Sequence, residues 1–208
     1  MSCQAGTTPE IVMKWMPVLL LSASLLSGAQ VFAADWSTLP EIKRSELQLY
    51  LTPQEAHALK QREGDKVLFV DVRTRAEAQY VGMATAVDAL VPFVEHQEMW
   101  TDWDEKRGMY QLEPFQDFVP EIERRLQEKG LGKDATLVLI CRSGDRSSKA
   151  ADRLAKAGYA RVYSVPEGFE GDMGKEGAAA GRRAVNGWKN AGLPWSYKLD
   201  KARMYFPR

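Results

Sequence analysis

One short stretch of the sequence combines the residue types that nucleophilic sulfur chemistry needs. Cys141 ends an apolar run and is followed by a loop-forming segment: Arg142, Ser143, Gly144, Asp145, Arg146 and Ser147. A loop between a buried strand and a helix points backbone N–H groups inward, and the helix dipole adds partial positive charge. Gly144 permits a backbone conformation that a side chain would resist. Two flanking arginines then favour the thiolate of Cys141, which predicts a nucleophile inside an anion-binding loop.

Two other interpretations of this cysteine follow from the same residues. Cys141 could be a structural residue buried at a strand end. It could also belong to a cysteine phosphatase or arsenate reductase, whose loop is larger and holds five residues between the cysteine and an arginine. Here four residues separate Cys141 from Arg146, and Ser147 stands at the position of that arginine. The shorter loop favours a sulfur atom over a phosphate.

The elements around the loop predict an α/β fold. Four runs have the apolar, β-branched composition of strands: 66–72, 85–92, 135–140 and 161–165. Three segments have helical spacing and end signals: 52–61, 114–130 and 147–157. Their alternation implies one domain with a central parallel sheet and helices on both faces. Cys141 would stand at the carboxyl end of a strand, where such sheets bind ligands.

Two segments interrupt this alternation. Residues 94–113 carry tryptophans and a tyrosine among acidic residues, and we expect a solvated loop, with a lid or partner-binding surface as the alternative. Residues 168–187 contain six glycines without the proline that a collagen triple helix requires, so we expect a flexible insertion. We do not expect catalysis from His57, within a predicted surface helix, or from His96, within the first of these segments.

Composition excludes several function classes. The 208 residues carry 28 Lys and Arg against 28 Asp and Glu, which gives no excess of positive charge for nucleic acid or an anionic membrane. With 45% apolar residues, a wholly disordered chain is not expected. Two cysteines far apart, Cys3 and Cys141, and two histidines do not form a zinc motif. We therefore expect no metal and no cofactor.

The beginning of the chain predicts export. Lys14 precedes an apolar run over 18–26, and 31–33 offers small residues for cleavage after Ala33. Residues 1–33 are therefore a predicted signal peptide, with Met13 as a possible true start. An uncleaved membrane anchor is the alternative. The mature chain, 34–208, would be exported, periplasmic if the source is a Gram-negative bacterium, and without stable membrane association.

Longer stretches resemble a known family in a fixed order. LVLICRSGDRSSKAADRLAKAGYARVYSVPEGFEG resembles the active-site half of the rhodanese sulfurtransferases, and DVRTRAEAQYVG followed by VDALVPF resembles their first half. The similarity runs from about Thr52 to Trp195. It implies a single rhodanese domain over about 48–197, with a five-stranded parallel sheet and Cys141 as the sulfur-carrying residue. The stretch YVGM after Glu77 departs from the family because it lacks a histidine that is common there.

The resemblance also implies a mechanism. Cys141 would take the outer sulfur of a small anionic donor such as thiosulfate, and a nucleophilic acceptor, cyanide or a thiol, would remove it. The loop residues after Cys141, from Arg142 to Ser147, would bind the substrate, Arg146 by a fork of hydrogen bonds. Asp71 and Arg73 would fix neighbouring loops. The alternative is a non-catalytic rhodanese module that binds a protein partner or relays sulfur to it.

Overall fold

The computed structural model describes Met1 and residues 34–207 of the chain. The predicted signal peptide, apart from Met1, and the possible start at Met13 therefore lie outside the described residues. Within the described part, no helix is long and apolar enough to cross a membrane. That part also lacks a group of histidine, cysteine or acidic side chains that could hold a metal ion.

A four-stranded parallel sheet forms the centre of the molecule. Its strands lie in the order β3-β1-β8-β9: Ala89–Leu90, Val67–Asp71, Thr136–Ile140 and Val162–Val165. In the central pair, Val67 lies opposite Thr136 and Asp71 opposite Ile140. This register brings the carboxyl ends of β1 and β8 to the same edge, directly before Val72 and Cys141. The predicted α/β class with a central parallel sheet is confirmed.

The expected fifth strand is reduced to a single bridge. Beside β9, Tyr50 pairs with Ser164, and the N–H of Leu51 donates to the Ser164 carbonyl over 3.0 Å. The pairing ends there because Thr52 and Pro53 begin helix α1 (Pro53–Glu63). At the opposite edge, Arg203 donates to the carbonyls of Thr85 and Val87 just before β3.

Helices cover both faces of the sheet. Residues that alternate along β1 and β8 enter two separate cores, because successive side chains of a strand point to opposite faces. One core contains side chains of α3 (Phe118–Glu128) and α4 (Asp145–Lys156). The other contains Ala56 of α1 and Ala78 of α2 (Arg75–Val81). Short 3-10 helices complete the helical elements: η1 Glu41–Lys43, η2 Gly64–Lys66, η3 Gly177–Ala179 and η4 Lys201–Arg203.

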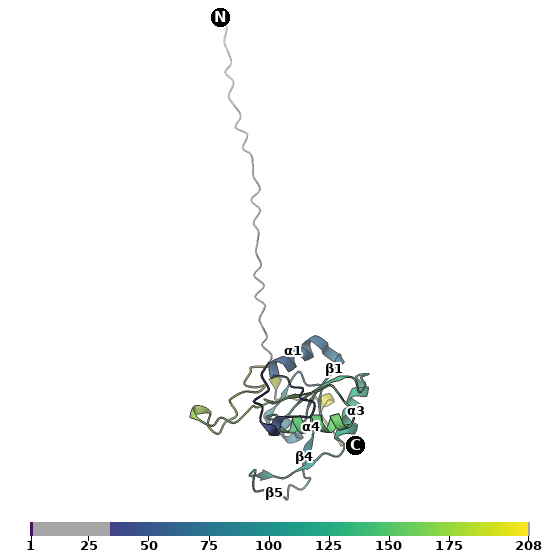
Figure 1. Cartoon of the computed structure of the whole chain (residues 1–208), viewed down its shortest axis with the longest axis vertical. Helices are drawn as coiled ribbons and strands as arrows, with labels where there is room; N and C mark the ends of the chain where they lie inside the picture. The colour runs from purple at the N-terminus through teal and green to yellow at the C-terminus, as the bar shows by residue number, and fades with distance from the viewer. Residues whose placement is uncertain (2–33, 208) are drawn as a thin grey trace. The chain divides into compact units, whose positions relative to one another are not determined.

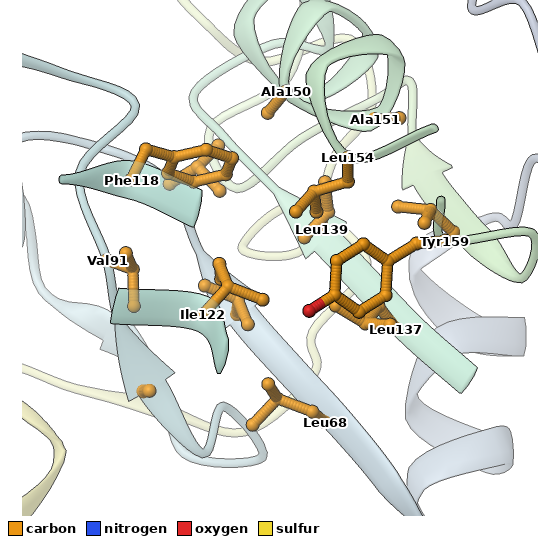
Figure 2. Packing of buried hydrophobic residues seen from close by; sticks show 14 of the residues in the cluster. Leu68, Val91, Phe118, Ile122, Leu137, Leu139, Ala150, Ala151, Leu154 and Tyr159 are labelled. Atoms are coloured by element: carbon orange, nitrogen blue, oxygen red, sulfur yellow. The ribbon is translucent and has the colours of Figure 1, made fainter. Parts of the chain in front are cut away.

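Helix α4, which follows the cysteine loop, is fixed to the sheet by its apolar face. Leu154 points from α4 toward Leu139 of β8, and Ala150, Ala151 and the ring of Tyr159 belong to the same cluster (Figure 2). All five side chains are buried. The packing therefore sets where the first turn of α4, and with it the loop, stands relative to β8.

Several predicted boundaries were wrong. Only Ala89–Leu90 of the run 85–92 joins the central sheet, and β2 (Met83–Ala84) pairs instead with β10 (Trp195–Ser196) in an antiparallel ladder. The predicted helix 114–130 begins at Phe118, since Asp117 precedes it and 112–114 form a strand. The predicted helix 147–157 begins two residues earlier, at Asp145. Helix α2 was not predicted, although Thr74 and Glu77 form a complete capping box at its start.

Residues 94–114 form a hairpin arm. The predicted exposure of 94–113 to solvent is confirmed, but the prediction of a loop without strands is wrong. Strands β4 (Val94–His96) and β7 (Leu112–Pro114) pair at its base, and β5 (Trp103–Asp104) pairs with β6 (Met109–Tyr110) farther along. The arm extends away from the central sheet (Figure 1). Aromatic contacts support its folding, because the Trp100 ring stacks on His96 at 3.8 Å and meets Tyr110 edge-on.

The glycine-rich segment also has a defined course. Met173 and Gly174 form bridges with Arg183 and Ala180, so the chain folds back on itself between them. The side-chain carbonyl of Asn186 accepts the N–H of Asp172 over 2.8 Å. The predicted insertion is therefore present as a folded excursion.

We expect the α4 packing to be a large contribution to stability. Leu154→Ala should lower the free energy of unfolding by about 2–5 kcal/mol, because it removes buried methyl groups and leaves a cavity against β8. Urea unfolding monitored by circular dichroism would measure the change. Lys156→Ala on the exposed side of the same helix is the matched control and should change stability by less than about 0.5 kcal/mol. Equal losses in both variants would contradict this account.

Candidate functional site

Cys141 stands at the carboxyl end of β8 and is almost fully buried. Its side chain is 1% exposed. The N–H of Gly144 donates to the Cys141 sulfur over 3.1 Å, and the hydroxyl of Ser147 lies 3.5 Å from it. The sulfur therefore accepts one backbone N–H from its own loop, and its thiol donates to the Ser147 hydroxyl oxygen.

Ser147 connects the loop to the sheet. Its hydroxyl donates to the carbonyl of Gly144 over 3.1 Å and accepts from the hydroxyl of Ser164 on β9 over 2.9 Å. Ser147 is fully buried, and the helix has begun at Asp145. The residue that stands where a phosphatase would have arginine is thus a neutral side chain that fixes the loop.

Two glycines allow the close packing around the cysteine. Gly144, the N-cap of α4, has φ +98°, and a Cβ there would lie 2.1 Å from the carbonyl oxygen of Pro166. Gly168 has φ +67°, and its Cβ would lie 2.5 Å from the carbonyl of Arg142. The segment 166–171 therefore packs directly on the loop. The N–H of Phe169 also donates to the Cys141 carbonyl over 2.8 Å.

Arg146 binds a carboxylate of the protein itself. Its two terminal nitrogens each donate to Glu77 over 2.6 Å, so the predicted fork of hydrogen bonds is formed with α2 and not left open for a donor. Burial raises the pKa of Glu77, but the hydrogen bonds and charge of Arg146 outweigh burial and lower this pKa to about 2. The same pair raises the pKa of Arg146 despite its burial. Arg146 therefore positions the loop against α2.

The guanidinium group of Arg142, in contrast, has no hydrogen-bond or ion-pair partner among the residues that the structure describes. Its Nε atom is buried without an acceptor. Burial lowers the pKa of Arg183, and the positive charge of Arg142 lowers it further, which indicates two cations near each other beside the loop. A buried N–H donor without an acceptor is costly unless a ligand supplies one, and the rest of this half-exposed side chain remains accessible. Arg142 is thus the loop residue available to an anionic ligand.

Asp71 and Arg73 form a fully buried ion pair after β1. The Nη2 atom of Arg73 donates to Asp71 over 2.6 Å and to the carbonyl of Gly82 over 2.7 Å. The guanidinium lies 4.1 Å from the ring centre of Phe169, in the segment that packs on the cysteine loop. Burial lowers the pKa of Arg73, but Asp71 outweighs it and the pKa is raised. The pair connects the end of β1 to Gly82 and to the segment 166–171.

A cavity of about 460 Å³ opens beside the loop. Loop and α4 residues line one side, and the hairpin arm lines the other. Sequence reasoning missed its contributions from outside the loop: Glu77, Phe93, Val94, His96, Arg107, Met109, Leu112 and Lys149. His57, by contrast, packs edge-on against Trp188. The sequence did contain a signal for the arm, because Gly108 is a turn residue between the aromatic residues Trp103 and Tyr110. In the structure Gly108 has φ +62°, and the two aromatic rings meet edge-on.

The fold and the loop together define a class of protein. Proteins of this class have an α/β domain in which a cysteine follows a central parallel strand. The sulfur of that cysteine accepts a backbone N–H from the first residues of the next helix. Residues 52–174 match the family described as Rhodanese-like domain, and the chain belongs to this family. The predicted family is therefore confirmed, whereas the predicted domain limits of 48–197 stay a prediction.

Relatives support the same assignment. An uncharacterized protein of Rickettsia rickettsii, the RP600 homolog, is 29% identical over 136 residues, which cover 64% of this chain and 85% of that protein. Rhodanese-like domain-containing protein 9 of the Arabidopsis thaliana chloroplast is 24% identical and covers 74% and 71% of the two chains. The crystal structure of Rv0390 from M. tuberculosis has a TM-score of 0.52 and 27% identity, covering 71% of this chain and 96% of that one.

The Glu77–Arg146 pair predicts how stability depends on pH. Because the folded-state pKa of Glu77 lies below its ordinary value of 4.5, its stabilising effect is complete above about pH 4.5 and is lost as pH falls toward 2. The shift corresponds to about 3 kcal/mol. Glu77→Gln should therefore be less stable than the original protein at pH 7 by about that amount, and the difference should shrink by pH 2.5.

Urea unfolding at the two pH values would measure both differences. Glu46→Gln, in an exposed pair with Lys156, is the control and should have little effect at either pH. A pH-independent loss in Glu77→Gln would contradict the assignment.

Proposed function

We propose that the protein is a sulfurtransferase, in which Cys141 receives a sulfane sulfur from a small anionic donor such as thiosulfate and passes it to a nucleophilic acceptor. Membership in the rhodanese-like family supports sulfur transfer as the reaction class. The observation that carries the proposal is the Cys141 sulfur, which accepts the Gly144 N–H beside the unpartnered Arg142. A nucleophile and an anion site then meet in one loop.

The two half-reactions balance without an added oxidant. The Cys141 thiolate attacks the outer sulfur of thiosulfate, the sulfur–sulfur bond of the donor breaks, and sulfite leaves with the electron pair. The acceptor, cyanide or a thiolate, then attacks the outer sulfur of the Cys141 persulfide. The bond between the two sulfurs breaks and its electron pair returns to Cys141. The Gly144 N–H would hold the negative sulfur in both steps.

We assign the remaining loop residues to two tasks. Arg142 attracts the anionic donor, with Ser143 beside it on the loop. Gly144, Arg146 and Ser147 hold the loop conformation through contacts with Pro166, Glu77 and Ser164. Asp145, paired with Lys149 at 2.6 Å, offsets one of the positive charges near the donor.

A non-catalytic module that binds a protein partner is the second candidate. The near-complete burial of Cys141 favours it, because a donor must reach a sulfur with little exposed surface. Covalent capture of sulfur separates the two candidates directly. We further propose that the protein is exported, on the strength of the signal-like pattern in residues 1–33.

The purified protein should gain one sulfur atom when it is incubated with thiosulfate. Intact-mass spectrometry would detect the gain, and cyanide should remove the sulfur and release thiocyanate. Cys141→Ser, which keeps a residue of similar size, should gain nothing. A protein whose Cys141 is reduced and can be alkylated, yet takes up no sulfur from thiosulfate, would exclude this donor and favour the binding module.

Arg142→Ala should raise the KM for thiosulfate more than it lowers kcat. The expected increase is about tenfold, since the donor loses one charge-assisted contact. Steady-state thiocyanate formation would give both constants. Arg161→Ala, at the opposite end of the sheet just before β9, should leave both constants unchanged. A fall in kcat with unchanged KM would place Arg142 in the chemical step instead.

A further inference from the structure

The glycine-rich excursion, residues 171–187, begins directly on the cysteine loop. The N–H of Gly171 donates to the Arg142 carbonyl over 3.3 Å, and the Gly171 carbonyl accepts from the Nη1 atom of Arg183 over 2.6 Å. A Cβ at Gly171 would lie 1.8 Å from the carbonyl oxygen of Asn186, so the two ends of the excursion are in direct contact. A single glycine residue therefore connects the guanidinium group of Arg183 to the backbone of the loop.

A second cavity, of about 590 Å³, lies between this excursion and the loop. Ser143 belongs to its lining, and the other lining residues are Pro40, Lys43, Asp172, Met173, Lys175, Arg183 and Val185. The acidic side chain in this lining, Asp172, is paired with Lys43 of η1 at 2.6 Å. Arg183 and Lys175 form no ion pair with the residues that the structure describes. The cavity beside Ser143 therefore has an excess of positive charge.

The base of the excursion is fixed, so Arg183 has a defined place beside the loop. Asp172 and Asn186 bind each other twice, because the Asp172 N–H donates to the side chain of Asn186 over 2.8 Å and the Asn186 amide donates back over 3.1 Å. Farther along, the N–H of Gly174 donates to the carbonyl of Arg182 over 2.8 Å. A ligand of Arg183 would therefore meet a cation that folding has already positioned.

Arg183 and Arg142 both lack an anion. The Nε atom of Arg142 is buried without an acceptor, and the hydrogen bond of Arg183 to Gly171 leaves its other N–H groups without an acceptor in the described part of the chain. Three carboxylates raise the pKa of Arg183: Glu170, Asp172 and Glu77. Burial and the charge of Arg142 outweigh them, and Glu170 lines neither of the two cavities beside the loop. An anion bound to both arginines would relieve the repulsion between them.

We propose that Arg183 binds the oxyanion group of the sulfur donor together with Arg142, and that this pair selects donors with two negative charges. This proposal rests on the proposed function. When the Cys141 thiolate attacks the outer sulfur of thiosulfate, a sulfur–sulfur bond forms at Cys141. The sulfur–sulfur bond of the donor breaks, and its electron pair leaves on sulfite. Two guanidinium groups match the two charges of thiosulfate and of sulfite, whereas a donor with one charge engages one of them.

Thiosulfate and methanethiosulfonate test the selectivity, because both transfer an outer sulfur but carry two negative charges and one. Arg183→Gln should raise the KM for thiosulfate about tenfold and the KM for methanethiosulfonate about twofold or less. Arg183→Lys keeps the charge and should recover most of the difference between the donors. Arg182→Gln, at the neighbouring exposed position outside the cavity lining, should change neither KM. Equal increases for both donors would show that Arg183 only supports the fold.

A second measurement does not depend on sulfur transfer. Sulfate carries two charges and cannot donate sulfur, and calorimetry should detect its saturable binding to the full-length protein. Its affinity should fall about tenfold in Arg183→Gln and stay unchanged in Arg182→Gln. Sulfate binding that depends on Arg183 in a protein that takes up no sulfur would keep the anion site and contradict the proposed function. Sulfur uptake with the same KM for thiosulfate in Arg183→Gln as in the original protein would contradict the assignment of Arg183 alone.

Discussion

The ion pair between Glu77 and Arg146 is the interaction on which the arrangement of the site depends. It joins the first turn of α2, after β1, to the first turn of α4, after β8. Arg73 also stabilises the charge of Glu77, so opposite charges alternate from Asp71 through Arg73 and Glu77 to Arg146. These charges end at Arg146, in the same loop as Cys141, and so fix the position of that loop. The parallel pairing of β1 and β8 makes this sequence of charges possible, because it brings both strand ends to one edge.

Two arginines four residues apart in the chain consequently do different work. Arg146 is neutralised within the protein, whereas Arg142 is left without a partner in the described part of the chain. The segment 166–171 packs on the loop at Gly144 and on the backbone of Arg142. The charge of Arg142 lowers the pKa of Arg183, so a second cation lies near it. The loop therefore combines rigidity with one uncompensated cation, which suits repeated binding and release of small anions.

Much of this molecule could be predicted from the sequence, and the failures have physical causes. Strands β1 and β8 are buried on both faces and are continuous apolar runs, so their positions and the location of Cys141 were evident. The partner of Arg146 was not, because Glu77 is distant in the chain and only strand pairing brings it near. The hairpin arm was mistaken for a loop since its strands are short and half-exposed, with no apolar alternation. The role of Arg107 in lining the cavity follows only from that arm.

The two borders of the central sheet have a consequence for how copies of this chain can meet. An open strand edge presents free N–H and C=O groups to any other extended chain, and such edges promote aggregation. Here the bridge at Tyr50 occupies one border beside β9, and Arg203 takes the carbonyls of Thr85 and Val87 next to the two-residue β3 at the other. Neither border can be lengthened by a strand from a second copy without displacing these contacts. The central sheet of the folded domain is therefore protected against lengthening by a strand from another copy of the chain.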